Sequence, residues 1–195
     1  MAESLRIGIV LGSTRTGRFA DRPADWLLEV ATARAAGAAT FERVDLRDYP
    51  LPFFDEPMSP MRGPSKHEVA QRWAAKVREL DGFVFVTGEY NHGIPAALKN
   101  AIDYVYAEWN RKPAGYVSYG GAGGTRAIEQ LRMNLVEVQV APIRSAVHIM
   151  RGDYMDLVLH GKTFADFPHL EQMAHVMLDD LLWWARTLRA GRAAG

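Results

Sequence analysis

The sequence contains no cysteine in its 195 residues. This absence excludes disulfide bonds, thiol nucleophiles and thiolate metal ligands together. The six histidines show neither the H-x-x-x-H nor the H-E-x-x-H spacing of metal-binding helices, so we predict no metal site. Chemistry that depends on a sulfur nucleophile or on a histidine-bound metal is therefore not expected of this chain.

An excess of charge and a long hydrophobic run are missing as well. The 23 Lys and Arg residues balance the 23 Asp and Glu residues, whereas proteins that bind nucleic acid through its phosphates usually carry a basic excess. No apolar run approaches the roughly 20 residues that cross a bilayer, and residues 1–6 lack the features of a signal peptide. We therefore expect a cytoplasmic protein whose partners include neither nucleic acid nor a membrane.

Short apolar runs alternate with segments of helical periodicity, and the chain is long enough for one domain over residues 1–195. Strands are expected at 5–11, 40–45, 82–86, 113–118 and 144–150, and helices at 21–36, after a capping-box sequence at 65–68, from 95, from 125 and at about 168–190. This order predicts an α/β fold with a doubly wound, five-stranded parallel sheet in the flavodoxin-like order 2-1-3-4-5 and helices on both faces. The Pro-rich segment 50–64 and a loop of about twenty residues after the last strand are long enough to act as flaps.

In such a sheet a ligand binds beyond the carboxyl ends of the strands, so the loops after the first, third and fourth strands should hold the site. The first loop, residues 12–19, combines hydroxyl groups, backbone N–H groups and a helix N-terminus, which all favour an anion. Arg15 and Arg18 add donors suited to phosphate oxygens. The alternative is a polar turn that only leads into the helix. The loop matches neither G-x-G-x-x-G nor G-K-[ST], so ATP hydrolysis is not expected.

The other two loops contain residues suited to a flat ring. Segment 87–95 has two glycines, the aromatic Tyr90 and Asn91, which is both donor and acceptor; alternatively, it is a turn in which Asn91 caps the next helix. No carboxylate in the sequence is placed to orient His92, which we expect to be an exposed loop residue. Segment 120–124 has four glycines, which let the backbone lie against a flat ligand or form a flexible turn. Together the three loops predict a site for a mononucleotide with an aromatic ring.

Several segments follow one another in an order typical of one family: Glu89-Tyr90-Asn91, then 94–103, Lys112-Pro113 and 120–124. With these segments the chain resembles, from about Leu5 to Ile149, the NADPH-dependent FMN reductase family. It departs from the family at Gly88, where proline is usual, and at Arg18-Phe19-Ala20, where many members have Ser-Phe/Tyr-Asn.

The resemblance implies a flavodoxin-like oxidoreductase that binds FMN and uses NADPH or NADH. It also implies which residues bind the cofactor. Ser13, Arg15 and Arg18 would bind the phosphate, together with the N–H groups of Phe19 and Ala20. Glu89, Tyr90 and Asn91 would lie along the isoalloxazine, with Gly120, Gly121 and Gly124 at its other edge. Lys99, Asn100 and Asp103 match the family motif but lie beyond the first turn of their helix, so we expect them to tie that helix to its neighbours.

The resemblance also implies a mechanism in which FMN carries the chemistry and no side chain has a catalytic role. NAD(P)H and a small oxidised acceptor (a quinone, a free flavin, an azo dye or a metal oxyanion) would use the same open flavin face in turn, which implies ping-pong turnover. A carboxylate beside the reduced flavin would disfavour its negative charge, so we expect Glu89 to point away or to pair with an arginine. Two alternatives stay open: a flavodoxin-type single-electron carrier, although such carriers tend to be acidic, and a non-enzymatic nucleotide-sensing regulator.

Aromatic residues continue past the helix expected from residue 95. Tyr104, Tyr106 and Trp109 follow its buried stripe and cannot all face one sheet. Aromatic side chains beyond what a core accommodates are typical of an interface, and partial burial under a loop is the alternative. We therefore predict a homodimer or homotetramer with the Trp109 region near the interface.

Overall fold

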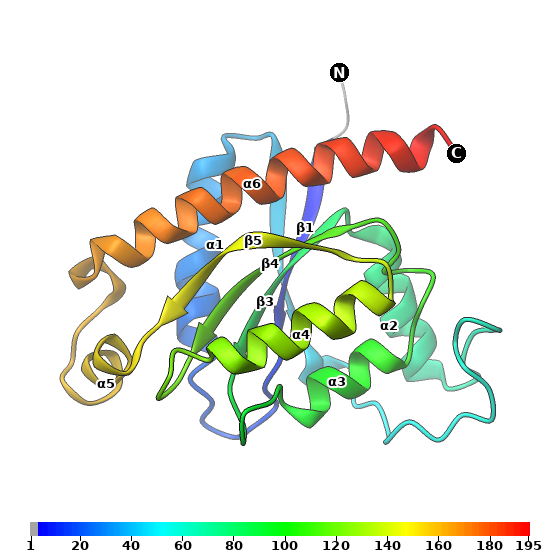
Figure 1. Ribbon diagram of the computed structural model, residues 1–195, viewed down its shortest axis with the longest axis horizontal. Helices are drawn as coiled ribbons and strands as arrows, with labels where there is room; N and C mark the ends of the chain where they lie inside the picture. The colour runs from blue at the N-terminus through cyan, green and yellow to red at the C-terminus, as the bar shows by residue number, and fades with distance from the viewer. Residues whose placement is uncertain (1–3) are drawn as a thin grey trace.

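The computed structural model describes residues 4–195, in which five strands form a parallel sheet of order β2-β1-β3-β4-β5 (Figure 1). The strands are β1 Leu5–Leu11, β2 Ala39–Asp45, β3 Gly82–Gly88, β4 Pro113–Tyr119 and β5 Ala141–Ile149. The helices are α1 Asp21–Ala35, α2 Glu68–Glu79, α3 Ala96–Asp103, α4 Thr125–Glu137, α5 Arg151–Leu159 and α6 Pro168–Ala193, with short 3₁₀ turns η1 Leu46–Asp48 and η2 Phe164–Asp166. The predicted fold class and strand order are confirmed.

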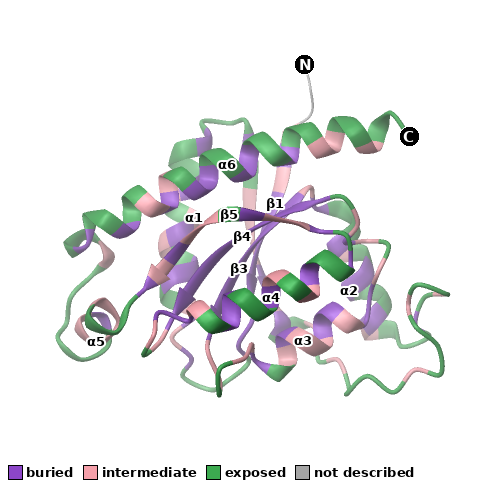
Figure 2. Ribbon diagram, in the orientation of Figure 1, coloured by how far each residue is buried: buried purple, intermediate pink, exposed green. Residues whose placement is uncertain are grey.

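Helices cover both faces of the sheet. α1 and α6 pack on one face, while α2, α3 and α4 pack on the other (Figure 1). Every residue of β3 and β4 is buried, as expected for parallel strands that are covered on both sides. In Figure 2 the helices turn a buried stripe to the sheet and an exposed stripe outward, which is the amphipathic pattern of their sequences. The strand order reverses between β1 and β3, so the crevice at their carboxyl ends is where a ligand is expected.

The end of the chain differs from the prediction in two places. β5 begins at Ala141, three residues before the expected start, and includes Pro142. Because β5 is an edge strand, the missing N–H of that proline costs the sheet little. The predicted loop after this strand is also wrong, since α5 and η2 follow β5 almost at once. The apolar residues of α5 do not recur at helical spacing, and Leu157 is its one buried residue, so the sequence carries little helix signal there.

The capping box predicted at residues 65–68 is not formed. α2 begins at Glu68 and His67 precedes it, so Ser65 lies too early to be the N-cap residue. The Ser65 hydroxyl instead donates to the Glu56 carboxylate and accepts the backbone N–H of His67 at 3.1 Å. A carboxylate from the preceding segment therefore competes with the helix for this hydroxyl group.

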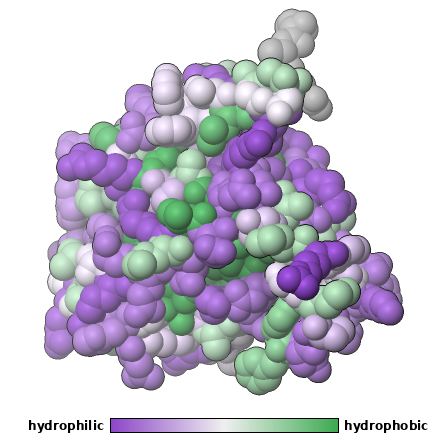
Figure 3. All heavy atoms as spheres, turned by 45° about the vertical axis from the view of Figure 1, so that its right-hand side comes forward, coloured by the Kyte–Doolittle hydropathy of each residue, from purple (hydrophilic) through white to green (hydrophobic). Residues whose placement is uncertain are grey.

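The segment 50–64 is irregular, as its prolines predict, and it extends from the sheet on the right of Figure 1. Figure 3 turns that side forward and shows hydrophobic atoms among a largely hydrophilic surface. Asn100 holds the segment to α3, because its side chain accepts the N–H of Phe54 at 2.9 Å and donates to the carbonyl of Pro52 at 2.7 Å. Lys99 pairs with Asp103 at 2.7 Å along the helix. The contacts of Asn100 confirm the tying role expected for that residue, whereas the Lys99–Asp103 pair lies within α3 itself and does not test it.

The aromatic residues after α3 belong to the core. Tyr104 and Trp109 are buried within the chain, and the Trp109 ring lies 4.8 Å from that of Phe83, centroid to centroid. The Trp109 indole N–H donates to the carbonyl of Ile102 at 3.3 Å. The core therefore accommodates Tyr104 and Trp109, contrary to the prediction, while Tyr106 is only half-buried; Trp109 itself is not available to a partner. A homodimer or homotetramer stays a prediction without this support.

Lys112 lies directly before β4 and is almost fully buried. Its ammonium donates to the carbonyls of Val77 and Arg78, at 2.7 and 3.0 Å, at the end of α2. Burial lowers its pKa from 10.5 to about 8. Between these two values the unfolded chain binds the proton more tightly than the folded chain does, so stability must increase with pH across this window.

We therefore expect the free energy of unfolding to rise between about pH 8 and pH 10.5, by up to about 3 kcal/mol. Urea unfolding at several pH values measures this rise. Lys112→Met keeps a side chain of similar length and removes the titrating group, so its profile should lack this rise. Equal slopes for the two proteins would show that Lys112 is not the group responsible.

Candidate functional site

The loops after β1, β3 and β4 converge at one edge of the sheet. The hydroxyl groups of Ser13 and Tyr90 are 2.8 Å apart, and the guanidinium of Arg15 lies 5.9 Å from the centre of the Tyr90 ring. A cavity of about 260 Å³ opens beside them, lined by the β1–α1 loop together with Tyr90, Tyr119 and Tyr154. The structure thus brings together residues from separate loops that the sequence assigns to one site.

The β1–α1 loop, residues 12–20, offers free hydrogen-bond donors. Within the described residues, no acceptor is bound by the backbone N–H groups of Thr16, Gly17, Phe19 and Ala20. Arg15 is exposed, and its guanidinium has no carboxylate partner in residues 4–195. Backbone N–H groups at the start of α1 with a cation beside them form the donor set that a phosphate group requires.

Arg18 is placed differently from Arg15. Its side chain is buried and all five of its N–H groups donate within the protein. The acceptors are Asp21 Oδ1 and Oδ2 at 2.8 and 2.9 Å, the Ser13 carbonyl at 2.6 Å, and both carboxylate oxygens of Asp45. The guanidinium therefore has no N–H left for a phosphate, contrary to the role expected from the sequence. Arg18 instead ties the loop to α1 and to the end of β2.

These charges stabilise one another. The hydrogen bonds to Asp45 and Asp21 raise the pKa of Arg18 further above its already high value. The hydrogen bond from Arg18 lowers the pKa of Asp21. Burial alone would raise the pKa of Asp45, but hydrogen bonds from Arg18 and from the N–H of Arg47 outweigh it and lower that pKa. The three groups are therefore ionised at neutral pH.

The β3–α3 loop begins with a tight turn. The N–H of Tyr90 donates to the carbonyl of Gly93 at 2.9 Å, and the N–H of Gly93 donates back at 3.0 Å. Asn91 and His92 between them both have left-handed backbones, with φ of 51° and 68°. Such a turn fixes the backbone that carries the Tyr90 ring. Asn91 and His92 are exposed, as expected for His92, and Asn91 does not cap the next helix, whose N-cap residue is Pro95.

Glu89 points away from the β1–α1 loop. Its carboxylate pairs with the Arg126 guanidinium and accepts the Arg126 backbone N–H at 3.2 Å, in the first turn of α4. Arg126 also donates to Nε2 of His92 at 2.7 Å. The expectation that Glu89 pairs with an arginine is confirmed, and the pair holds the β3–α3 loop against the start of α4.

The glycines of the β4–α4 loop, residues 120–124, serve different purposes. Gly120 and Gly124 have φ of 140° and 69°, which other residues rarely adopt. A Cβ atom at Gly124 would also lie 2.8 Å from the Ser118 Cβ, so packing against β4 requires glycine there. Gly121 has neither constraint, since a Cβ there meets nothing within 4 Å. The missing side chain at Gly121 leaves the outer surface of this loop open.

Two tyrosines of the site have no role in the sequence prediction. Tyr119 ends β4 and stacks on Tyr154 of α5 with ring centres 6.1 Å apart, and the Phe19 ring meets both edge-on. Burial keeps the pKa of Tyr119 well above its usual range, so its hydroxyl stays neutral. A Cβ at Gly88 would come 2.9 Å from the Tyr119 ring, which accounts for glycine where the family usually has proline. The sequence did not predict Tyr154 as a site residue, because the segment that forms α5 was expected to be a loop.

Residues 4–195 show neither a metal centre nor a membrane span. No group of three or more His, Asp or Glu side chains in this part of the chain is arranged to hold a metal ion. None of the helices described is long and apolar enough to cross a bilayer.

Comparison with known proteins identifies the class. Residues 5–153 match the family of NADPH-dependent FMN reductases, and the chain belongs to that family. It is 40% identical over 150 residues to an NAD(P)H-dependent FMN reductase of Schizosaccharomyces pombe, covering 75% of this chain and 74% of the relative. It is 34% identical over 143 residues to a quinone reductase of Escherichia coli, covering 70% and 72%.

Solved structures agree on the fold. The flavoenzyme NAD(P)H:(acceptor) oxidoreductase FerB from Paracoccus denitrificans superposes with a TM-score of 0.72 at 19% identity, over 94% of this chain and 98% of FerB. Family membership confirms the predicted oxidoreductase class and its two cofactors, FMN and a nicotinamide nucleotide.

Proposed function

We propose that this protein binds FMN across the carboxyl edge of the sheet and reduces a small acceptor at the expense of NAD(P)H. The observation that carries the proposal is the hydrogen bond between Ser13 and Tyr90. Their hydroxyl groups are 2.8 Å apart and lie beside the free N–H groups of the β1–α1 loop. This hydrogen bond places the donor groups for a phosphate next to an aromatic residue from a different loop. A flavin mononucleotide has both chemical parts in one molecule.

The phosphate would be held by the β1–α1 loop. Ser13 and Arg15 would contribute side chains, and Phe19 and Ala20 would contribute backbone N–H groups that have no other acceptor in the described chain. Arg18 would act indirectly, since its bonds to Asp21 and Asp45 set the loop's conformation. The positive charge of Arg18 is largely neutralised by these carboxylates, so Arg15 would be the main cation at the phosphate.

The isoalloxazine would lie between the two other loops. Tyr90 and Asn91 would border one edge, and Glu89 would contribute only its main chain, because Arg126 binds its carboxylate. Gly120, Gly121 and Gly124 would receive the other edge through their backbone. The negative charge of Glu89 is thereby paired away from the ring, which favours an electron-rich reduced flavin.

FMN, when bound, would supply the hydride transfer from NADPH or NADH to the acceptor. The protein's residues would hold the ring and leave one face open, so the nucleotide must leave before the acceptor binds. Ping-pong turnover follows from this shared face. Quinones are the acceptors best supported, because relatives named quinone reductases match over 70% of this chain. Free flavins, azo dyes and metal oxyanions are further candidates.

Steady-state kinetics with NADPH and a benzoquinone test this function. We expect turnover that requires FMN, with parallel double-reciprocal lines when one substrate is varied at several fixed concentrations of the other. NADPH added without air to the FMN-loaded protein should bleach the flavin fully, and stepwise photoreduction should pass directly to the fully reduced flavin without a radical spectrum. Intersecting lines would contradict ping-pong turnover, and a stable radical would favour the electron carrier instead.

A further inference from the structure

A serine and a histidine lie directly behind the glycine loop that follows β4. Ser118 of β4 is fully buried, and His148 is its register partner on β5. The Ser118 Oγ is 2.6 Å from the Gly123 carbonyl oxygen and 2.7 Å from Nδ1 of His148. Neither residue has a part in the function proposed above.

The positions of the hydrogen atoms in these two hydrogen bonds follow from the chemistry of the acceptors. The Gly123 carbonyl can only accept, so the single hydroxyl hydrogen of Ser118 must point to it. Ser118 then accepts from His148, which means that Nδ1 of the imidazole carries a hydrogen. The hydrogen-bond chain therefore runs from His148 through Ser118 to Gly123, with each group donating to the next.

This hydrogen-bond chain fixes the orientation of the peptide unit between Gly123 and Gly124. In a trans peptide the C=O and the N–H of the next residue point in opposite directions, and no cis peptide occurs among residues 4–195. Because the Gly123 carbonyl points inward to Ser118, the N–H of Gly124 points outward from β4. No acceptor in the described chain binds that N–H, and Gly120 beside it has no side chain to cover it.

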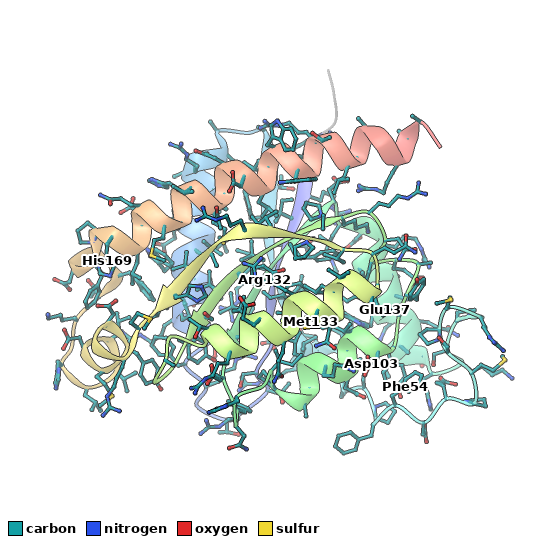
Figure 4. All side chains as sticks on the ribbon, in the orientation of Figure 1. Phe54, Asp103, Arg132, Met133, Glu137 and His169 are labelled. Atoms are coloured by element: carbon teal, nitrogen blue, oxygen red, sulfur yellow. The ribbon has the colours of Figure 1, made fainter. Side chains whose placement is uncertain are left out.

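The groups facing His148 keep its imidazole neutral. Burial lowers the pKa of His148, and the Arg132 cation of α4 adds to this, while the Gly123 carbonyl and Glu129 act in the opposite direction. Arg132 reaches from α4 to β5, where it donates to the carbonyls of Ile143 and Arg144 (Figure 4). A neutral imidazole with its hydrogen on Nδ1 is the form that the chain of hydrogen bonds needs.

We propose that Ser118 and His148 are positioning residues that hold the Gly124 N–H toward the flavin ring. The inference rests on the proposed FMN site and deepens it, since it assigns a rigid donor to the ring edge rather than to the phosphate. Loss of the pair would let the Gly123–Gly124 peptide rotate, because glycines on both sides allow many backbone conformations. The ring would then lose a fixed hydrogen-bond donor while the phosphate kept its own.

The experiment compares two ligands on the whole protein freed of flavin: FMN, and riboflavin, which has the same ring but no phosphate. His148→Leu removes the donor, and His148→Asn restores an N–H near the position of Nδ1. We expect His148→Leu to weaken both ligands by the same factor, about five- to tenfold, and His148→Asn to recover most of that loss. The visible absorption of the bound flavin should shift in His148→Leu and return in His148→Asn. Ser118→Ala should behave like His148→Leu, and thermal unfolding without flavin checks that each variant folds.

The outcomes separate this inference from the function on which it rests. Wild-type protein that binds neither ligand would contradict the FMN site itself. Wild-type protein that binds both, with His148→Leu unchanged in affinity and spectrum, would overturn only the positioning role. The positioning role is also overturned if His148→Asn binds no better than His148→Leu, because the side chain would then matter for its volume rather than for its donor.

Discussion

Replacement of Arg15 by glutamine is expected to weaken FMN binding by roughly 10- to 100-fold, which is the range of one or two charge-assisted hydrogen bonds. Arg15 is exposed at the β1–α1 loop and has no carboxylate partner in residues 4–195, so its charge is available to a ligand. Its neighbour Arg18 cannot substitute, because protein acceptors take all of its N–H groups. Fluorescence quenching of FMN measures the affinity.

Riboflavin is the matched ligand for this prediction, because it lacks the phosphate. Its affinity should be the same in Arg15→Gln and in the wild type. Arg186→Gln is the matched variant: it removes an equal charge from an exposed position that adjoins Ser4 and Leu5, at the opposite end of β1, and should bind FMN normally. An equal loss for FMN and riboflavin would mean that Arg15 acts on the ring or on the fold, and not on the phosphate.

Arg18→Met is expected to destabilise the protein by about 2–3 kcal/mol and to weaken FMN binding as well. The substitution leaves Asp45 and Asp21 facing each other without the cation that both carboxylates bind. The β1–α1 loop would then lose its tie to the end of β2. Because hydrogen bonds from Arg18 lower the pKa of Asp21 and contribute to the low pKa of Asp45, they stabilise the wild type at neutral pH, and this contribution is lost as the pH falls through those pKa values. Denaturant unfolding at neutral and acid pH measures both effects.

Arg34→Met provides the control for Arg18→Met. Arg34 also pairs with an aspartate, Asp179, but both side chains are largely exposed, so removal of this ion pair should leave the unfolding midpoint nearly unchanged. Arg18→Lys keeps the charge with fewer donors and should fall between the wild type and Arg18→Met. If Arg18→Met were as stable as Arg34→Met and bound FMN like the wild type, the proposed role of Arg18 in shaping the loop would be refuted.

The fold was predictable because its signals are local. The run 82–86 is apolar throughout and the run 5–11 is apolar apart from Arg6, which is typical of strands buried on both faces. The helices between the strands repeat apolar residues at helical spacing. The order of strands then follows from general rules for parallel sheets. The prediction missed α5 because its apolar residues do not recur at helical spacing; its buried residue Leu157 packs into a core built by other elements.

The position of the site was predictable for the same reason, since the carboxyl ends of β1, β3 and β4 must meet at one edge. The role of Arg18 was not predictable. Two of its acceptors come from Asp45, which is 27 residues away in the sequence and reaches Arg18 only because β2 pairs with β1. A sequence shows that an arginine is present in a loop, but it does not show which carboxylates the fold brings to it. The burial of Trp109 among α2, α3 and the sheet is a long-range outcome of the same kind.

Binding of FMN at the carboxyl edge of the sheet is tested by titrating flavin-free protein with FMN, followed by quenching of flavin fluorescence and by thermal unfolding. We predict saturable quenching with one FMN per chain and a higher unfolding temperature in the presence of FMN, as expected when a ligand binds only the folded state. Unquenched fluorescence together with an unchanged unfolding temperature at saturating FMN would contradict the proposed cofactor site.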